Sequence, residues 1–417
     1  MILAHSFGAR YDLPIPLALF VLGGGLVVLL SFALVLNRSR DVDPQQPAYE
    51  DTVPLSRTSA VWGGLSLLVT AALVYVGLAG AQAVAENIVP TVFWLLVWIG
   101  VPLTCGRLGD WTRPVNPFAF LAQLTDRPGL RRALLARSRP LRWPFGWWVA
   151  VGVFFLLACG ELIVNVTATE PRVIATGFVV YGVISALAGL LFGPSWRERG
   201  EVFTVLFATW GRLGWWRFGA PGPRRFTGSL RAPFAPAPGR IAFVLLLLIS
   251  VSFDGLLATP RWSTFEKGHT STGAGVDALR LVSFLALAVV TAVAFGAFAY
   301  GSARTDRHGG SPRPALAGLL PSMVPIAFAY LLAHNLQYLL VNGQLLGPLI
   351  GNPTGTAALR PAVAVQRHLR PGPGDPAERL LLVRRADRHR RRPRPRRRAR
   401  PSTPRSTSGR PAAGPPQ

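Results

Sequence analysis

Residues Ile241–Ala258 read IAFVLLLLISVSFDGLLA, an apolar stretch that contains a single charged side chain, Asp254. A run of about 20 apolar residues is long enough to cross the hydrocarbon core of a bilayer, which is about 30 Å thick. Such a run must fold as a helix, because lipid cannot satisfy an exposed peptide group. The stretch therefore predicts a transmembrane helix with an ionisable group inside it.

The rest of the chain repeats this pattern. Half of the 417 residues are hydrophobic and only 15% are charged, whereas soluble domains carry about 25% charged residues. Together with Ile241–Ala258, the apolar stretches are Leu13–Leu36, Val61–Ala81, Ile88–Leu103, Phe145–Val166, Val173–Phe192, Leu279–Tyr300 and Leu319–Val341. We therefore expect an all-α, polytopic integral membrane helix bundle with eight transmembrane helices.

The connections between these stretches alternate between rich and poor in arginine, which predicts their orientation. The second, fourth and sixth connections carry at most two basic residues each, whereas the third and fifth are long and strongly basic. Cytoplasmic loops carry an excess of Arg and Lys. The alternation places the odd-numbered connections in the cytoplasm and the N-terminus outside, and it predicts a location in the plasma membrane.

The net charge of +25 could suggest a nucleic-acid-binding protein. The arginines of the connections are, however, accounted for by membrane orientation. We expect the lipid bilayer as the partner and no nucleic acid.

The composition changes abruptly near Thr354, and the segment up to Gln417 carries 17 arginines against three acidic residues. Three interpretations compete: a basic tail that binds nucleic acid or anionic lipid, a solvated extension without a role, or a frameshift. Codons CGN for Arg, read one base later, become GNC for Val, Ala, Gly or Asp. Leu380–Arg400 would then be re-read as an apolar run of about 20 residues, the length of one more membrane helix. We favour the frameshift and expect a transmembrane domain over 1–351, a disordered tail over 352–417 and a lost ninth helix.

Two cytoplasmic connections contain short segments with helical spacing. Taken together, Phe118–Leu124 and Arg131–Arg137 combine apolar and basic residues, as a helix on an anionic membrane surface does. Glu201–Trp210 is too short to span a bilayer, and could be interfacial or re-entrant. We expect ordinary surface helices for these segments.

Ionisable residues inside membrane spans are costly, so they are candidates for function. The chain has Glu161, Asp254 and His334, each in the outer part of its predicted span, so the three could share one depth. Asn165 and Tyr338 lie four residues after Glu161 and His334, which puts each pair on one helix face. Other polar residues at the same side are Asn335, Gln337, Asn342, His5 and Asp12. The pattern predicts a polar site open to the extracytoplasmic face.

Three chemistries fit these residue types. His, Asp and Glu together can hold a divalent metal that acidifies a bound water for hydrolysis. The same groups can relay protons or bind a transported ion. Alternatively, each residue hydrogen-bonds a neighbouring helix and has no further role. Zinc-type spacings and a nucleophile elbow are absent from the sequence.

Three stretches, AHSFGARYDLPIP (Ala4–Pro16), SVSFDGLLATPRW (Ser250–Trp262) and YLLAHNLQYLLVNGQLLGPLIGNP (Tyr330–Pro353), carry a family resemblance. The chain up to about residue 353 resembles a family of multi-pass membrane proteins, widespread in actinobacteria, that is labelled fenitrothion hydrolase. The resemblance implies a bacterial plasma-membrane location and hydrolysis of a phosphotriester. If it holds, His5, Asp254 and His334 are the positions to test first. From the polar residues inside the spans, we expect Asp254, His334 and Glu161 as catalytic residues and His5, Asp254 and His334 as metal ligands.

Two function classes remain open at this stage. One is a membrane-embedded hydrolase of a small-molecule phosphotriester, for which a divalent metal is the candidate cofactor. The other is a non-enzymatic transporter of ions or small molecules, or a membrane assembly factor, that uses the same polar residues.

Overall fold

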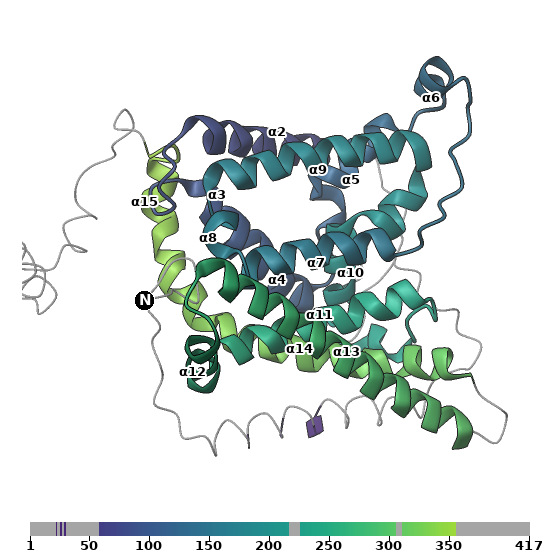
Figure 1. The fold of residues 1–417 in the computed structure, drawn as a ribbon. Helices are drawn as coiled ribbons and strands as arrows, with labels where there is room; N and C mark the ends of the chain where they lie inside the picture. Colours follow the sequence, from purple (N-terminus) through teal and green to yellow (C-terminus); the bar gives the residue numbers. More distant parts are fainter. Residues whose placement is uncertain are drawn as a thin grey trace, which may run out of the picture. The chain divides into compact units, whose positions relative to one another are not determined.

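The computed structural model describes residues 58–216, 226–305 and 311–355, together with the single residues Leu22, Leu26, Leu29 and Leu30. All regular elements of these residues are helices (Figure 1). The main ones are α2 (Thr58–Ala79), α3 (Ile88–Pro90), a π-helix (Thr91–Gly100), α4 (Val101–Leu108), α5 (Pro117–Thr125), α6 (Pro128–Leu135), α7 (Trp148–Leu162), α8 (Asn165–Ala168), α9 (Pro171–Phe192), α10 (Val202–Gly211), α11 (Pro238–Leu257), α12 (Pro260–His269), α13 (Gly273–Thr305), α14 (Pro312–Asn342) and α15 (Leu346–Gly351). The all-α class is therefore confirmed.

Six helical segments of the described chain are long and apolar enough to cross a membrane: Ala60–Ala79, Ile88–Leu108, Pro171–Phe192, Pro238–Leu257, Gly273–Arg304 and Pro312–Gly351. Each coincides with a predicted span. The predicted span Phe145–Val166 is instead a 15-residue helix, α7, followed by the short α8. The predicted span Leu13–Leu36 lies outside the described residues apart from four leucines. The count of eight spans therefore stays a prediction, as do the tail, the frameshift and the lost ninth helix.

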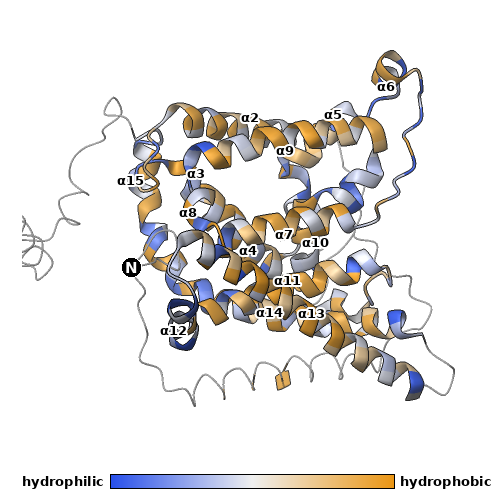
Figure 2. Ribbon diagram, in the orientation of Figure 1, coloured by the Kyte–Doolittle hydropathy of each residue, from blue (hydrophilic) through white to orange (hydrophobic). Residues whose placement is uncertain are grey.

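Helix α11 lies at the centre of the bundle, because 61% of its most apolar window is buried, against 11% for α2 and 6% for α13. The exposed faces of α2 and α13 are nevertheless apolar (Figure 2). A helix that is hydrophobic on its exposed side as well suits lipid rather than water. These two helices therefore present the lipid-facing surface of the bundle.

Two of the arginine-poor connections lie at the same end of the bundle. Helix α8 adjoins one and α12 belongs to another, and both are at the left in Figure 1, while α6, in an arginine-rich connection, lies at the opposite end. The backbone N–H of Arg172 donates to the side chain of Gln82, which joins two of the arginine-poor connections directly. Which end faces the cytoplasm stays a prediction.

The expectation that the short segments of the basic connections are ordinary surface helices is wrong for α5 and α10. Helix α5 packs against α2 and α9, and nine of the ten residues of α10 are buried, with Thr204 half-buried. Phe118 of α5 stacks on Phe203 of α10, with ring centroids 5.5 Å apart. Both helices are short segments inserted into the bundle.

A buried carboxylate explains why α10 can begin inside the protein. Glu201 is fully buried and caps α10. Its two oxygens accept hydrogen bonds from Asn116, from Tyr181, from the backbone and hydroxyl of Thr204 and from the backbone of Phe203. The first N–H groups of a helix need such an acceptor. A carboxylate that is surrounded by donors can be buried at low cost.

Candidate functional site

Glu161 is placed where α7 is interrupted. The backbone N–H groups of Ile163 and Val164 both donate to the carbonyl of Cys159, at 2.9 and 3.1 Å, and the chain then turns into α8. β-Branched residues crowd a helix and lower its propensity, and Ile163, Val164 and Val166 surround the break. The interruption leaves Glu161 in the last turn of α7, close to the arginine-poor end of the bundle.

Trp98 holds the carboxylate of Glu161. The indole Nε1–H of Trp98 donates to Oε2 of Glu161 at 2.6 Å, and the Trp98 ring stacks on Phe154 of α7, with centroids 5.6 Å apart. Trp98 comes from the π-helix Thr91–Gly100, as does Trp94, whose Nε1–H donates to the carbonyl of Ala168 at 3.1 Å. π-Helical turns are rare in proteins, but those that occur are often found at functional sites.

The side chains of Asp254 and His334 form a close pair between α11 and α14. Nε2 of His334 lies 2.9 Å from Oδ2 of Asp254, and both side chains are less than one-fifth exposed. The ring of Tyr330, one turn before His334, stacks on the imidazole with centroids 5.8 Å apart and an interplanar angle of 16°. Tyr330 fits because residue 255 is a glycine: a Cβ there would lie 1.3 Å from the tyrosine hydroxyl oxygen.

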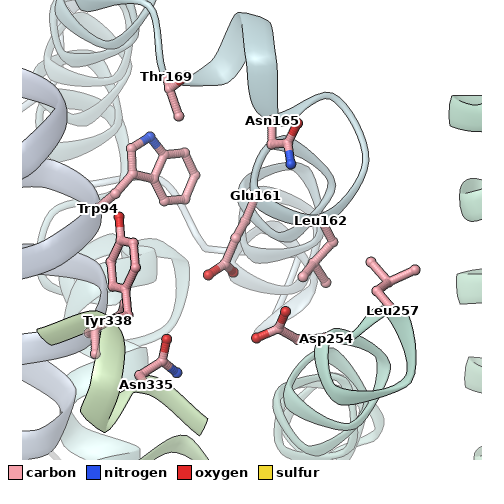
Figure 3. A pocket seen from close by; sticks show the side chains of 10 residues that line it. Trp94, Glu161, Leu162, Asn165, Thr169, Asp254, Leu257, Asn335 and Tyr338 are labelled. Carbon is pink, nitrogen blue, oxygen red and sulfur yellow. The ribbon is translucent and has the colours of Figure 1, made fainter. Parts of the chain in front are cut away.

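A cavity of about 30 Å³ lies beside both Glu161 and Asp254. It is lined by Trp94, Ile99, Glu161, Leu162, Asn165, Thr169, Asp254, Leu257, Asn335 and Tyr338. Figure 3 shows the carboxylates of Glu161 and Asp254 pointing into the same space, with Asn335 and Tyr338 facing it from α14. A cavity needs roughly 10–15 Å³ of such space for each water molecule, so this one has room for about two.

The structure thus brings together the three ionisable residues that the sequence singled out. Glu161 and Asp254 line one cavity, and His334 adjoins it through Asp254. Asn165, Asn335 and Tyr338, the polar neighbours on the same helix faces, line it too. Their roles in catalysis or binding stay predictions, and no finding bears on them.

The metal hypothesis, with His5, Asp254 and His334 as ligands, stays a prediction, because the structure describes only part of the chain. Within that part, no group of three His, Cys, Asp or Glu side chains could hold a metal ion. His5, the remaining proposed ligand, lies outside the described residues.

The sequence reasoning missed the two tryptophans of the site. Trp94 and Trp98 lie four residues apart in the stretch TVFWLLVWIG. That spacing puts both indoles on one side of a helix, and a buried Trp N–H needs an acceptor. The spacing was therefore a usable signal, although it does not identify the acceptor.

These features define the class of protein: a helical protein whose apolar spans fit a lipid bilayer, with a small polar cavity between the spans. Comparison with protein-family models, with curated proteins and with solved structures gave no match. The function must therefore be argued from the cavity itself.

Proposed function

We propose that this protein is a bacterial plasma-membrane transporter that binds and transfers protons at Glu161, Asp254 and His334. The observation that carries the proposal is the His334–Asp254 pair beside a second carboxylate, with a cavity of water size between them. Ionisable groups inside membrane spans typically mark proton relays and ion pathways.

The charges of the three residues support proton binding. A protonated imidazole at His334 neutralises the charge of one carboxylate. The negative charge of the second carboxylate then has no counter-charge in a region of low dielectric constant. An unpaired buried charge is expensive, and protonation removes it. Glu161 is the group that takes this proton, because Asp254 has the imidazole as its partner and Glu161 has an indole N–H, which carries no charge.

The size of the cavity favours protons over a larger substrate. In this conformation the cavity has room for about two water molecules, which is enough for a water-mediated proton transfer between Glu161 and Asp254. Asn335 and Tyr338 line the same space and supply polar contacts for such water.

Reconstitution of the full chain into liposomes that contain a pH-sensitive dye tests the proposal. A pH gradient should drive proton uptake above that of empty liposomes, and Glu161→Gln and Asp254→Asn should each lower the rate at least about tenfold. Glu170→Gln is the matched control, because Glu170 is an exposed acid at the same end of the bundle and does not line the cavity. Uptake equal to that of empty liposomes, or equal rates for all variants, would contradict the proposal.

A phosphotriester hydrolase, as the family resemblance implies, is the second candidate. The observation in its favour is that Asp254 orients the His334 imidazole, an arrangement that lets a histidine take a proton from water. A phosphotriester is larger than two waters, so the cavity would have to open to admit it. Turnover of a chromogenic phosphotriester by the purified protein, abolished in Asp254→Asn, would support this candidate over the transporter.

A further inference from the structure

We propose that residues 127–142, which we call the arginine arm, form a docking surface for the headgroups of anionic phospholipids. The arm contains α6 and lies at the arginine-rich end of the bundle, away from the cavity (Figure 1). The proposal is independent of the proton site.

The arm is fixed to the end of a membrane-spanning helix. Arg131 is 2% exposed and donates to the carbonyl of Leu190 at 2.6 Å and to that of Gly189 at 3.2 Å, and its guanidinium also pairs with Asp126. Further along the arm, the backbone N–H of Leu141 donates to the carbonyl of Leu191 at 2.7 Å. The three acceptors belong to the last turn of α9, where helix carbonyls lack some or all of their helical partners; that of Gly189 also accepts from the N–H of Gly193.

This anchoring sets the depth of the arm. Helix α9 is apolar over Pro171–Phe192 and long enough to cross a membrane. The last turn of such a helix lies at the edge of the hydrocarbon core. The arm is therefore held at the level of the lipid headgroups.

The arm presents positive charge at that level. Its exposed arginines are Arg127, Arg132, Arg137, Arg139 and Arg142. The sequence of the arm contains no acidic residue. The preceding acid, Asp126, already pairs with Arg131 and with Arg197. The guanidinium group of an arginine can bind two phosphate oxygens at once. The phosphate of an anionic lipid headgroup therefore complements the positive charge of the arm.

The exposed apolar face of α6 favours a lipid over other anionic molecules as the ligand of the arm. Leu130 and Leu134, which are 36% and 62% exposed, lie one turn apart on α6. Amphipathic helices of this kind insert their apolar face at the boundary between headgroups and acyl chains. A nucleic acid offers phosphate but no hydrocarbon for these leucines.

The test measures binding of phosphatidylglycerol to the full chain in detergent micelles, by native mass spectrometry, with phosphatidylcholine as the neutral comparison. The test variant is Arg132→Gln, Arg137→Gln and Arg139→Gln combined. The matched control removes three exposed basic residues at the opposite end of the bundle, by Arg172→Gln, Arg261→Gln and Lys267→Gln. Each basic residue near an anionic surface is worth about fivefold in affinity.

We expect the test variant to bind phosphatidylglycerol at least about tenfold more weakly, and the control within about twofold of the wild type. Equal losses in both variants, or no loss in either, would overturn the proposal. Leu134→Gln, which leaves every arginine in place, should also weaken phosphatidylglycerol binding; unchanged binding in that variant would refute insertion of the leucines.

Two further additions identify the ligand. Inorganic phosphate and a short DNA oligonucleotide are each added at the same phosphate concentration as the lipid. Binding of phosphatidylglycerol alone supports a lipid surface. Equal binding of either soluble ligand, lost in the same arginine variant, would show that the arm does not require a lipid.

Discussion

Two glutamates, the buried Glu201 and the half-buried Glu161, should differ in how much the same substitution destabilises the protein. Glu201 accepts five hydrogen bonds, from Asn116, Tyr181, Phe203 and Thr204, the last of which donates twice. In Glu201→Gln, one oxygen becomes an NH2 group, which is itself a donor. Whichever way the amide is turned, at least one N–H donor then faces another donor, because only the hydroxyls of Tyr181 and Thr204 can turn to accept instead.

The magnitude follows from these contacts. A hydrogen bond to a charged group contributes about 1.5–3 kcal/mol. The loss of at least one such bond gives an expected decrease of at least about 1.5–3 kcal/mol in the free energy of unfolding for Glu201→Gln. Glu161 accepts one hydrogen bond among the described residues, from Trp98, and the oxygen of a glutamine can accept it equally well. Glu161→Gln should therefore change the free energy of unfolding by less than about 1 kcal/mol.

Unfolding of the purified protein by increasing SDS in mixed micelles, followed by loss of helical circular dichroism, measures both values. Glu170→Gln, at an exposed position, sets the baseline for removing a charge. If Glu161→Gln destabilised the protein as much as Glu201→Gln, Glu161 would be a structural residue, and the reasoning that separates it from Glu201 would be refuted. A Glu201→Gln variant as stable as the wild type would equally refute it.

Two further predictions use the same SDS titration. Arg280 makes a bidentate ion pair with Glu266, at 2.9 and 3.0 Å, and both side chains are less than one-tenth exposed. Arg280→Gln should therefore lower the free energy of unfolding by about 3–5 kcal/mol. The exposed Arg261→Gln is its control, and a loss equal to that of the control would contradict the prediction. A Cβ at residue 189 would lie 2.2 Å from a backbone carbonyl oxygen of α5. Gly189→Ala should therefore lower the free energy of unfolding by about 1–3 kcal/mol. Gly177→Ala, in the same helix but facing open space, should not destabilise the protein, and equal losses in the two variants would count against the packing argument.

The spans and the depth of the polar residues could be predicted from the sequence. Apolar length depends only on composition, so the stretches around α2, α9 and α11 could be identified directly. Position within a span gave the common depth of Glu161, Asp254 and His334, because each residue adds a fixed rise along a helix axis. Depth alone was sufficient to expect that the three would lie near one another.

Direct partners could not be predicted, because they depend on the rotation of each helix about its axis. The Trp98–Glu161 bond joins residues 63 positions apart, and nothing local to either residue encodes the other. The interruption of α7 after Leu162 also changes the direction of the chain beyond Glu161.

The burial of α10 was missed for a related reason. Glu201 follows the charged stretch WRERG, which is typical of a surface. Its burial depends on donors such as Asn116, 85 residues earlier, and these come together only when α5 and α10 pack.

The π-helix Thr91–Gly100 has a consequence for the whole span that contains it. Each residue of an α-helix turns the chain by about 100°, and a π turn takes up an additional residue without that rotation. The wide turns therefore set the rotation of the two tryptophans relative to Gly106, further along the same span. Trp94 reaches α8 and Trp98 reaches Glu161, whereas Gly106 packs closely against Phe328. If this stretch tightened to α-helical geometry, the two ends of the span would twist relative to each other, and the span could not keep both sets of neighbours at once.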